Sequence, residues 1–236
     1  MADTSAQIDG ASAMLAAMQL ADSFFPSGMY TQSHGLERFI AAGLAGEADL
    51  EPLLHAYLRN VAGPGEALAA RWVARAAAAG DLDLVTAVDA RLEATKLAPE
   101  GRLASRRCGG RVAALGAELF GGSVLSAYTQ RVEAGRTPGH QAVALALAAA
   151  ACGLDEATAV LIELHSFAIS LVSAAVRLGS IDHIAGQRLI ARIRPTMALA
   201  AAAGEHADWR EIGGFAPQIE IMQFQHRYDD MHLFVS

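Results

Sequence analysis

The chain is organised around one interruption in its alanine-rich helices, the stretch DSFFPSGMYTQSHGLE at residues 22–37. We call this stretch the elbow. Pro26 has no backbone N–H and a fixed φ, so a helix arriving over residues 14–22 is expected to end just before it. Gly28 permits a sharp bend. The elbow therefore predicts two helices joined by a short, stiff turn.

The second half of the elbow predicts the start of the next helix. Ser33 is expected to cap that helix by accepting a hydrogen bond from one of its first amides. Apolar residues then follow at helical spacing, and the helix is expected to end near Gly43. The aromatic side chains predicted to lie between the two helices are Phe24, Phe25 and Tyr30.

The composition favours one large helical domain. Of the 236 residues, 53% are hydrophobic and 18% are charged, which is enough apolar mass to bury a sizeable core. The formal net charge of −7, without a basic block, argues against nucleic acid as a partner. Cys108 and Cys152 lack C-x-x-C spacing, which argues against a disulfide framework or a thiolate metal site and fits a reducing compartment.

Apolar periodicity punctuated by glycine and proline predicts an all-α fold. We expect a single compact bundle of about nine or ten helices with an extended C-terminal tail. The sequence GPG at 63–65 is expected to end the helix that begins near Leu50. Residues 158–176 approach membrane-spanning length, but Glu163 and His165 near the middle favour a helix buried on all sides in a soluble core.

Three regions are predicted along the chain. Residues 1–10 are polar and acidic, lack the basic start of a signal peptide, and are expected to be flexible. Residues 11–218 form the helical domain. Residues 219–236 form a tail in which apolar, aromatic and histidine residues mix. Such a tail either folds back onto its own domain or serves as an adhesive segment for another chain.

The sequence holds no motif for catalysis or nucleotide binding. Lys96 is the only lysine and belongs to no phosphate-binding loop, and no G-x-S-x-G occurs. Arginines near Cys108 would lower the pKa of its thiol, although a buried or idle cysteine is the preferred interpretation. We therefore expect no enzymatic activity and no cofactor.

The eight histidines form no recognised metal motif, since neither H-E-x-x-H nor paired Glu-x-x-His is present. His226 and His232 would chelate a metal only if the tail turned, and are otherwise ordinary surface or interface groups. His34 either buttresses the elbow or takes part in binding. No metal site is therefore predicted.

The elbow resembles the signature of the urease accessory protein UreF family. The resemblance is carried by QLADS at 19–23, by Pro26 and Gly28, and by SHGLE at 33–37. Further matching segments follow in the family's order: SRR at 105–107, SAAVRLG at 173–179, GQRL at 186–189 and the closing LFVS at 233–236.

The resemblance implies an all-helical cytoplasmic protein that forms a homodimer and is not an enzyme. Members join the accessory protein UreD, also called UreH, and the GTPase UreG on the urease apoprotein. There they support GTP-dependent nickel delivery. Neither nucleic acid nor a membrane is expected as a partner. The partner-binding residues that we predict are Tyr30, His34, Glu37, His226, Tyr228 and Phe234.

Two alternatives stay open. The first is a stand-alone helical metal-binding protein that uses His226, His232 and His34. The second is an adaptor that also stimulates GTP hydrolysis with an arginine finger, for which the sequence offers Arg106, Arg107 and Arg227.

Overall fold

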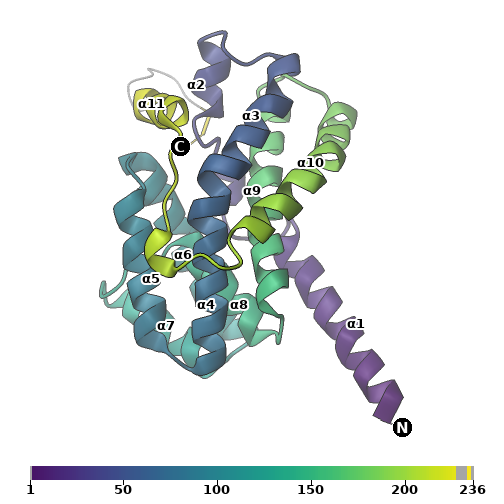
Figure 1. The fold of residues 1–236 in the computed structure, drawn as a ribbon, viewed down its shortest axis with the longest axis vertical. Coiled ribbons are helices and arrows are strands. Elements are labelled where there is room, and N and C mark those ends of the chain that lie inside the picture. The colour runs from purple at the N-terminus through teal and green to yellow at the C-terminus, as the bar shows by residue number, and fades with distance from the viewer. Residues whose placement is uncertain (1, 227–232, 235–236) are drawn as a thin grey trace.

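The computed structural model describes residues 2–226 and 233–234, and in this part of the chain every regular element is helical (Figure 1). The all-α prediction is confirmed. The α-helices are α1 Ala2–Ala21, α2 Leu36–Ala41, α3 Leu50–Tyr57, α4 Leu68–Ala79, α5 Leu82–Thr95, α6 Pro99–Leu119, α7 Ser123–Glu133, α8 Gln141–Ala151, α9 Glu156–Arg177, α10 His183–Ala203 and α11 Pro217–His226. Short 3-10 turns occupy Met29–Thr31, Glu47–Asp49 and Trp209–Glu211.

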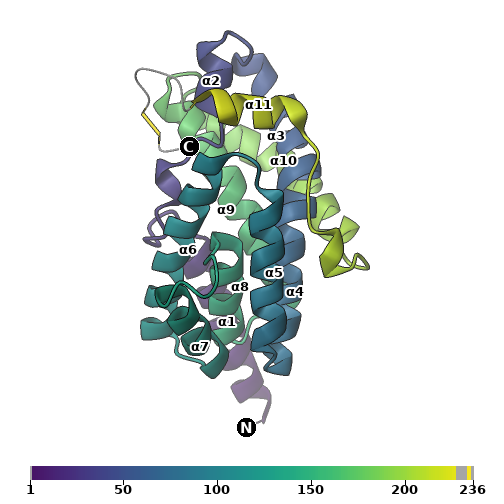
Figure 2. The ribbon, with the colours of Figure 1, turned by 90° about the vertical axis from the view of Figure 1, so that its left-hand side faces the viewer.

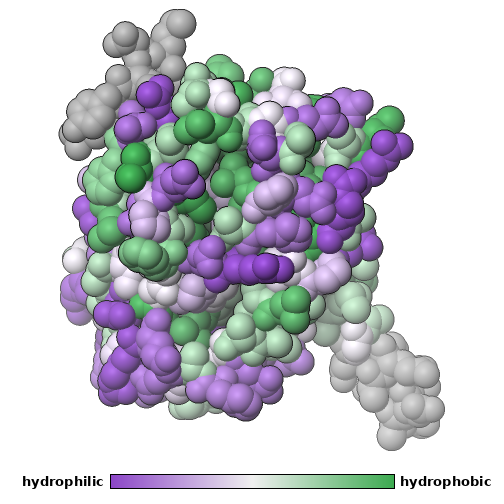
Figure 3. Space-filling view, turned by 45° about the horizontal axis from the view of Figure 1, so that its top comes forward, coloured by the Kyte–Doolittle hydropathy of each residue, from purple (hydrophilic) through white to green (hydrophobic). Residues whose placement is uncertain are grey.

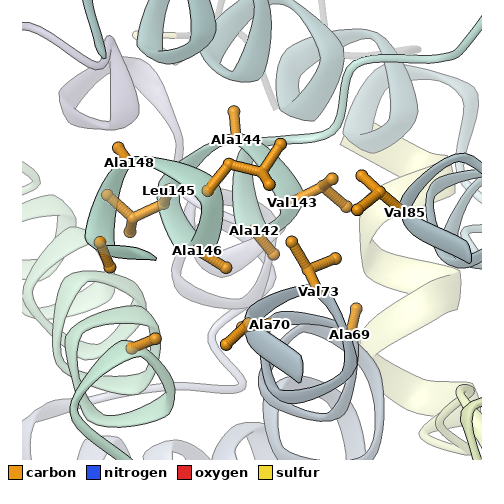
Figure 4. Close-up of a cluster of buried hydrophobic side chains, with 14 of the residues drawn as sticks. Ala69, Ala70, Val73, Val85, Ala142, Val143, Ala144, Leu145, Ala146 and Ala148 are labelled. Carbon is orange, nitrogen blue, oxygen red and sulfur yellow. The ribbon is translucent and has the colours of Figure 1, made fainter. Parts of the chain in front are cut away.

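Two hydrophobic clusters lie one above the other in the bundle, in the orientation of Figure 1. The lower cluster is centred on α8, whose residues 141–149 are all buried against α4, α6 and α9. Figure 4 shows the alanine and valine side chains of α8 and α4 meeting there. The upper cluster joins α2, α3, α9, α10 and α11. Because alanine side chains are small, helices that carry them can approach closely, which fits the alanine-rich composition.

The prediction that the sequence GPG ends a helix is wrong. α3 continues through a π-helical segment, Leu58–Ala67, directly into α4. Pro64 has no amide to donate to the Asn60 carbonyl four residues earlier. That carbonyl instead accepts the Phe215 amide at 3.1 Å, and the Pro64 carbonyl accepts the Gly213 amide at 3.0 Å. The segment after α10 therefore donates hydrogen bonds to two carbonyls of the helix around Pro64.

The segment after α10 can approach the helix at Asn60 this closely because Gly214 has no side chain. A Cβ added there would lie 2.3 Å from the Asn60 carbonyl oxygen. The contact fixes the path of the chain from α10 towards α11. It thereby brings α11 back across the bundle, where it packs against α2 and α6 (Figure 2).

The elbow differs from the prediction in two respects. Phe25 is buried, but Phe24 is 92% exposed and Tyr30 is 62% exposed, so only one of the three aromatic side chains lies between the helices. The residue that precedes α2 is Gly35, and no side chain caps the helix, so Ser33 is not its cap. The Leu36 amide instead binds the Ser33 backbone carbonyl at 2.9 Å.

α9 is long and apolar enough to cross a membrane by length and hydropathy, which no other helix in the described part of the chain is. Within its most apolar window, 67% of the residues are buried in the protein. Burial in the core is therefore confirmed, although not on all sides, because Leu161 is exposed. The expected division into residues 1–10, 11–218 and 219–236 stays a prediction.

Candidate functional site

The elbow reverses the chain through three residues with positive φ: Gly28 at 88°, His34 at 53° and Gly35 at 85°. His34 is the one non-glycine residue with positive φ in the described part of the chain. Its backbone carbonyl accepts a hydrogen bond from the Tyr57 hydroxyl at 2.6 Å and one from the side-chain amide of Gln223 at 3.2 Å. Because these two donors come from α3 and α11, His34 links the elbow to both of these helices.

The His34 side chain buttresses the elbow. Its ring lies 4.5 Å from the Phe167 ring, centroid to centroid, and its Nε2 lies 3.3 Å from the Ser170 hydroxyl. Burial, with a smaller contribution from the positive charge of Lys96, lowers the pKa of His34 to about 3. His34 is therefore neutral at physiological pH and packs and hydrogen-bonds against α9.

Glu37, in the first turn of α2, binds the C-terminal segment at several points. Its Oε1 accepts the Leu233 amide at 2.8 Å, and its Oε2 accepts the Phe234 amide at 3.3 Å. The same Oε2 lies 3.0 Å from Nε2 of His226. Carboxylates are strong acceptors of backbone amides and of charged donors. One side chain thus fixes two separate points of the tail.

His226 lies between two carboxylates. Its Nε2 faces Glu37, and its Nδ1 lies 3.2 Å from Oε2 of Glu100 on α6. The side chain is only 1% exposed. Each ring nitrogen therefore lies within hydrogen-bonding distance of a carboxylate oxygen. The end of α11 is therefore joined to α2 and α6 at once.

Arg177 forms the opposite side of this cluster. Its guanidinium lies 3.7 Å from the centroid of the Tyr30 ring and 4.2 Å from that of Phe234. Phe234 is 2% exposed, so the tail aromatic is buried. Burial lowers the pKa of Arg177, but a guanidinium stays charged at physiological pH. The arrangement joins elbow, α9 and tail through two cation–π contacts.

The backbone of α11 packs directly against the elbow at Gly35. A Cβ added to Gly35 would lie 2.9 Å from Cγ and 3.1 Å from the amide nitrogen of Gln223. Ile219 and Met222 on the same helix are buried in the upper cluster. The described part of the tail therefore folds back onto its own domain, which is one of the two uses that the sequence left open.

The structure brings most of the predicted site residues together. Tyr30, Glu37, His226 and Phe234 belong to the cluster around Glu37 and Arg177, which we call the tail-docking site, and His34 lies behind it. Tyr228 lies outside the described residues. Whether any of these residues contacts a partner stays a prediction.

Sequence reasoning missed three members of the tail-docking site and its support: Glu100, Arg177 and Gln223. Arg177 stands inside the segment SAAVRLG that resembles the family, and this was the one signal that pointed to it. Nothing local distinguishes Glu100 or Gln223 from other polar residues on helices.

Cys108 has a raised thiol pKa, contrary to the effect expected from its arginine neighbours. Burial raises the pKa and outweighs the hydrogen bond from Gln32, 3.0 Å away, and the charges of Arg111 and Arg107. Cys108 is therefore a buried thiol, as the preferred interpretation held.

No group of three or more histidine, cysteine, aspartate or glutamate side chains within residues 2–226 and 233–234 could hold a metal ion. His226 is occupied by Glu37 and Glu100, and His232, on which the metal-binding alternative also relied, lies outside these ranges. Of the candidate arginine fingers, Arg106 lies 3.7 Å from Glu93 and Arg107 is exposed, while Arg227 is outside the described residues.

Comparisons with known proteins point to one family. The family model described as UreF matches residues 44–194 of this chain. The urease accessory protein UreF of Paenarthrobacter aurescens (strain TC1) is 32% identical over 223 residues, which are 94% of this chain and 97% of the relative. The protein of the same name from Lachnoclostridium phytofermentans is 32% identical over 220 residues, with 93% and 96% covered. The family model begins after the elbow, whereas each of the two relatives is matched over more than nine-tenths of this chain.

Proposed function

Because the chain belongs to the urease accessory protein UreF family, we propose that it is a non-enzymatic adaptor in urease maturation. In this proposal it bridges the accessory protein UreD (UreH) and the GTPase UreG on the urease apoprotein, and so supports GTP-dependent nickel insertion. It acts in the cytoplasm as a homodimer. The nucleotide chemistry belongs to UreG.

The observation that supports this proposal is that several large apolar side chains along α1 and the elbow are exposed to solvent. Large apolar side chains on a protein surface are typical of contacts with other proteins when they gather in one region. Those exposed here are Met14, Leu15 and Met18 on α1, and Phe24 and Tyr30 in the elbow. On the face drawn in Figure 3, by contrast, apolar and polar side chains are interspersed.

The tail-docking site lies next to this exposed region through Tyr30. One side of the Tyr30 residue is open to solvent, while its ring contacts the same guanidinium that holds Phe234. A partner that covers Tyr30 would therefore also contact the surface that the tail completes. In this arrangement Tyr30 meets the partner, whereas the half-buried His34 and Glu37 and the buried His226 and Phe234 position that surface from behind.

Co-purification with the UreD and UreG homologues of the same organism tests the proposal. We expect the tagged full-length chain to capture both proteins. Phe24→Ala removes an almost fully exposed ring and should weaken capture without altering stability, because aromatic anchors that become buried on binding dominate interfaces. Phe215→Ala is the matched control, since Phe215 is 82% exposed but lies in the segment between α10 and α11.

The tail is tested separately by a chain that ends at His226. This end point retains α11, whose buried Ile219 and Met222 belong to the core, and removes Phe234. Loss of capture of either protein supports the tail as a docking element. If the full chain captures neither protein but binds nickel tightly in calorimetry, the adaptor is wrong and the metal-binding alternative replaces it.

A further inference from the structure

A cavity of about 320 Å³ lies between the elbow and helices α6, α8 and α9. We call it the elbow pocket. Its apolar wall is formed by Phe25, Leu145 and Ile169, of which Phe25 and Leu145 are buried in the core. A volume of this size lies at the lower end of the range for small-molecule sites.

One positive charge borders the pocket. Arg111, an exposed residue of α6, lines the elbow pocket and also the adjoining pocket of about 100 Å³ that contains Arg107. A Cβ added to Gly28 would lie 3.5 Å from Nη1 of Arg111, so the guanidinium lies close to the bend of the elbow. No carboxylate of the described residues forms an ion pair with Arg111 or Arg107.

The remaining polar groups complete the pocket. The hydroxyls of Ser166 and Ser173 line it, and neither has a hydrogen-bond partner among residues 2–226 and 233–234. The Ser170 hydroxyl is engaged with the carbonyls of Met29 and Gln32. Asp22 is an acidic residue of the lining, and its carboxylate accepts the Phe24 amide at 2.7 Å. The pocket thus combines an apolar wall, two free hydroxyls and one arginine without an acidic partner.

We propose that the elbow pocket binds a small organic carboxylate. The apolar body of the ligand packs against Phe25, Leu145 and Ile169, and its carboxylate binds the guanidinium of Arg111. Arginine and carboxylate match in both charge and planar geometry, so this end determines the orientation of the ligand. The ligand occupies the cavity as a free small molecule, and Arg107 adds positive charge in the adjoining pocket.

Titration calorimetry with 4-phenylbutyrate tests this site, and 4-phenylbutanol is the uncharged matched ligand. We expect the acid to bind the full chain and the alcohol to bind about tenfold or more weakly, because a charge-assisted hydrogen bond is lost. Arg111→Gln should reduce binding of the acid to the level of the alcohol. Arg188→Gln, on the exposed side of α10 and outside the pocket, should leave binding unchanged.

A second variant tests the cavity rather than the charge. Ser166→Phe places a ring into the elbow pocket and should abolish binding of both ligands, with folding checked by circular dichroism. Equal affinity for acid and alcohol, or full affinity in Arg111→Gln, would overturn the proposal. Absence of binding by the unaltered protein would overturn it as well. These outcomes are independent of UreD and UreG capture, because the probe is a free acid.

Discussion

The guanidinium of Arg177 lies 4.2 Å from the ring centroid of Phe234. Most of the C-terminal quarter of the chain separates these two residues in the sequence. The other contact of the guanidinium is the Tyr30 ring at 3.7 Å. Arg177 stands at the last position of α9, where the positive charge also complements the helix dipole. The last turn of a core helix is therefore the point at which the elbow and the tail meet.

Arg177→Ala should loosen the tail without unfolding the bundle. Each cation–π contact contributes about 0.5–2 kcal/mol. We expect faster hydrogen exchange of the α11 amides, measured by mass spectrometry, and only a small decrease in the melting temperature. Arg188→Ala serves as the control, because Arg188 is exposed and contacts neither ring. Unchanged protection of α11 in Arg177→Ala would show that the stacked rings do not hold the tail.

Glu37→Ala should have a larger effect than Arg177→Ala. It leaves two backbone amides without their acceptor and removes one of the two carboxylates beside His226, and each lost charge-assisted hydrogen bond costs about 1–3 kcal/mol. Limited proteolysis should then cleave the C-terminal segment early, and Glu37→Gln should show an intermediate rate because its amide keeps one acceptor oxygen. Glu47→Ala removes an exposed glutamate from the neighbouring turn and should behave as the unaltered protein. Equal cleavage rates in all four proteins would contradict the role of Glu37.

The fold was largely predictable from sequence because it depends on local signals. Helical periodicity acts within a few residues, and so do the side-chain caps that Asp155 and Asp182 form at the starts of α9 and α10. The continuation of the helix through Pro64 was not predictable. The carbonyls of Pro64 and Asn60 accept the amides of Gly213 and Phe215, about 150 residues away, and periodicity carries no information about such contacts.

The same distinction applies to the candidate site. Tyr30, Glu37 and Phe234 were named because the elbow and the tail are rich in aromatic residues and resemble segments of the UreF family. How they pair was not encoded locally: Glu37 and His226 are 189 positions apart. The pairing depends on the path of the chain from α10 to α11, which is set by the contact of Gly214 with Asn60.

Gly35→Ala should destabilise the protein more than Gly43→Ala. Both glycines have positive φ, at 85° and 69°, so both substitutions introduce a similar backbone strain of about 1 kcal/mol. Only at Gly35 does the added methyl group meet α11, because a Cβ added to Gly43 would have no atom within 4 Å. We expect an additional loss of about 1–3 kcal/mol in urea unfolding, from overpacking against Gln223. If the two variants are equally stable, the approach of α11 to the elbow does not require glycine.

Glu163→Gln should change the pH dependence of stability. Glu163 is fully buried in α9, and neither carboxyl oxygen meets a donor with hydrogen-bond geometry in the described part of the protein. Burial, reinforced by the negative charge of Glu66 and only partly opposed by Lys96 and Gln141, raises its pKa from 4.5 to about 8. The folded state therefore keeps the proton that the unfolded chain releases. Its contribution to stability is complete below pH 4.5 and is lost as pH rises towards 8.

The glutamine variant cannot ionise, so its free energy of unfolding relative to the unaltered protein should increase with pH across this window. We expect the variant to gain about 1–3 kcal/mol between about pH 5 and pH 8.5, measured by urea unfolding. Glu118→Gln, at an exposed position of α6, should follow the unaltered protein at every pH. A difference between Glu163→Gln and the unaltered protein that does not vary with pH would mean that Glu163 is ionised in the fold. The buried carboxylate would then need a cationic partner, and Lys96, which already pairs with Glu66, is the nearest candidate.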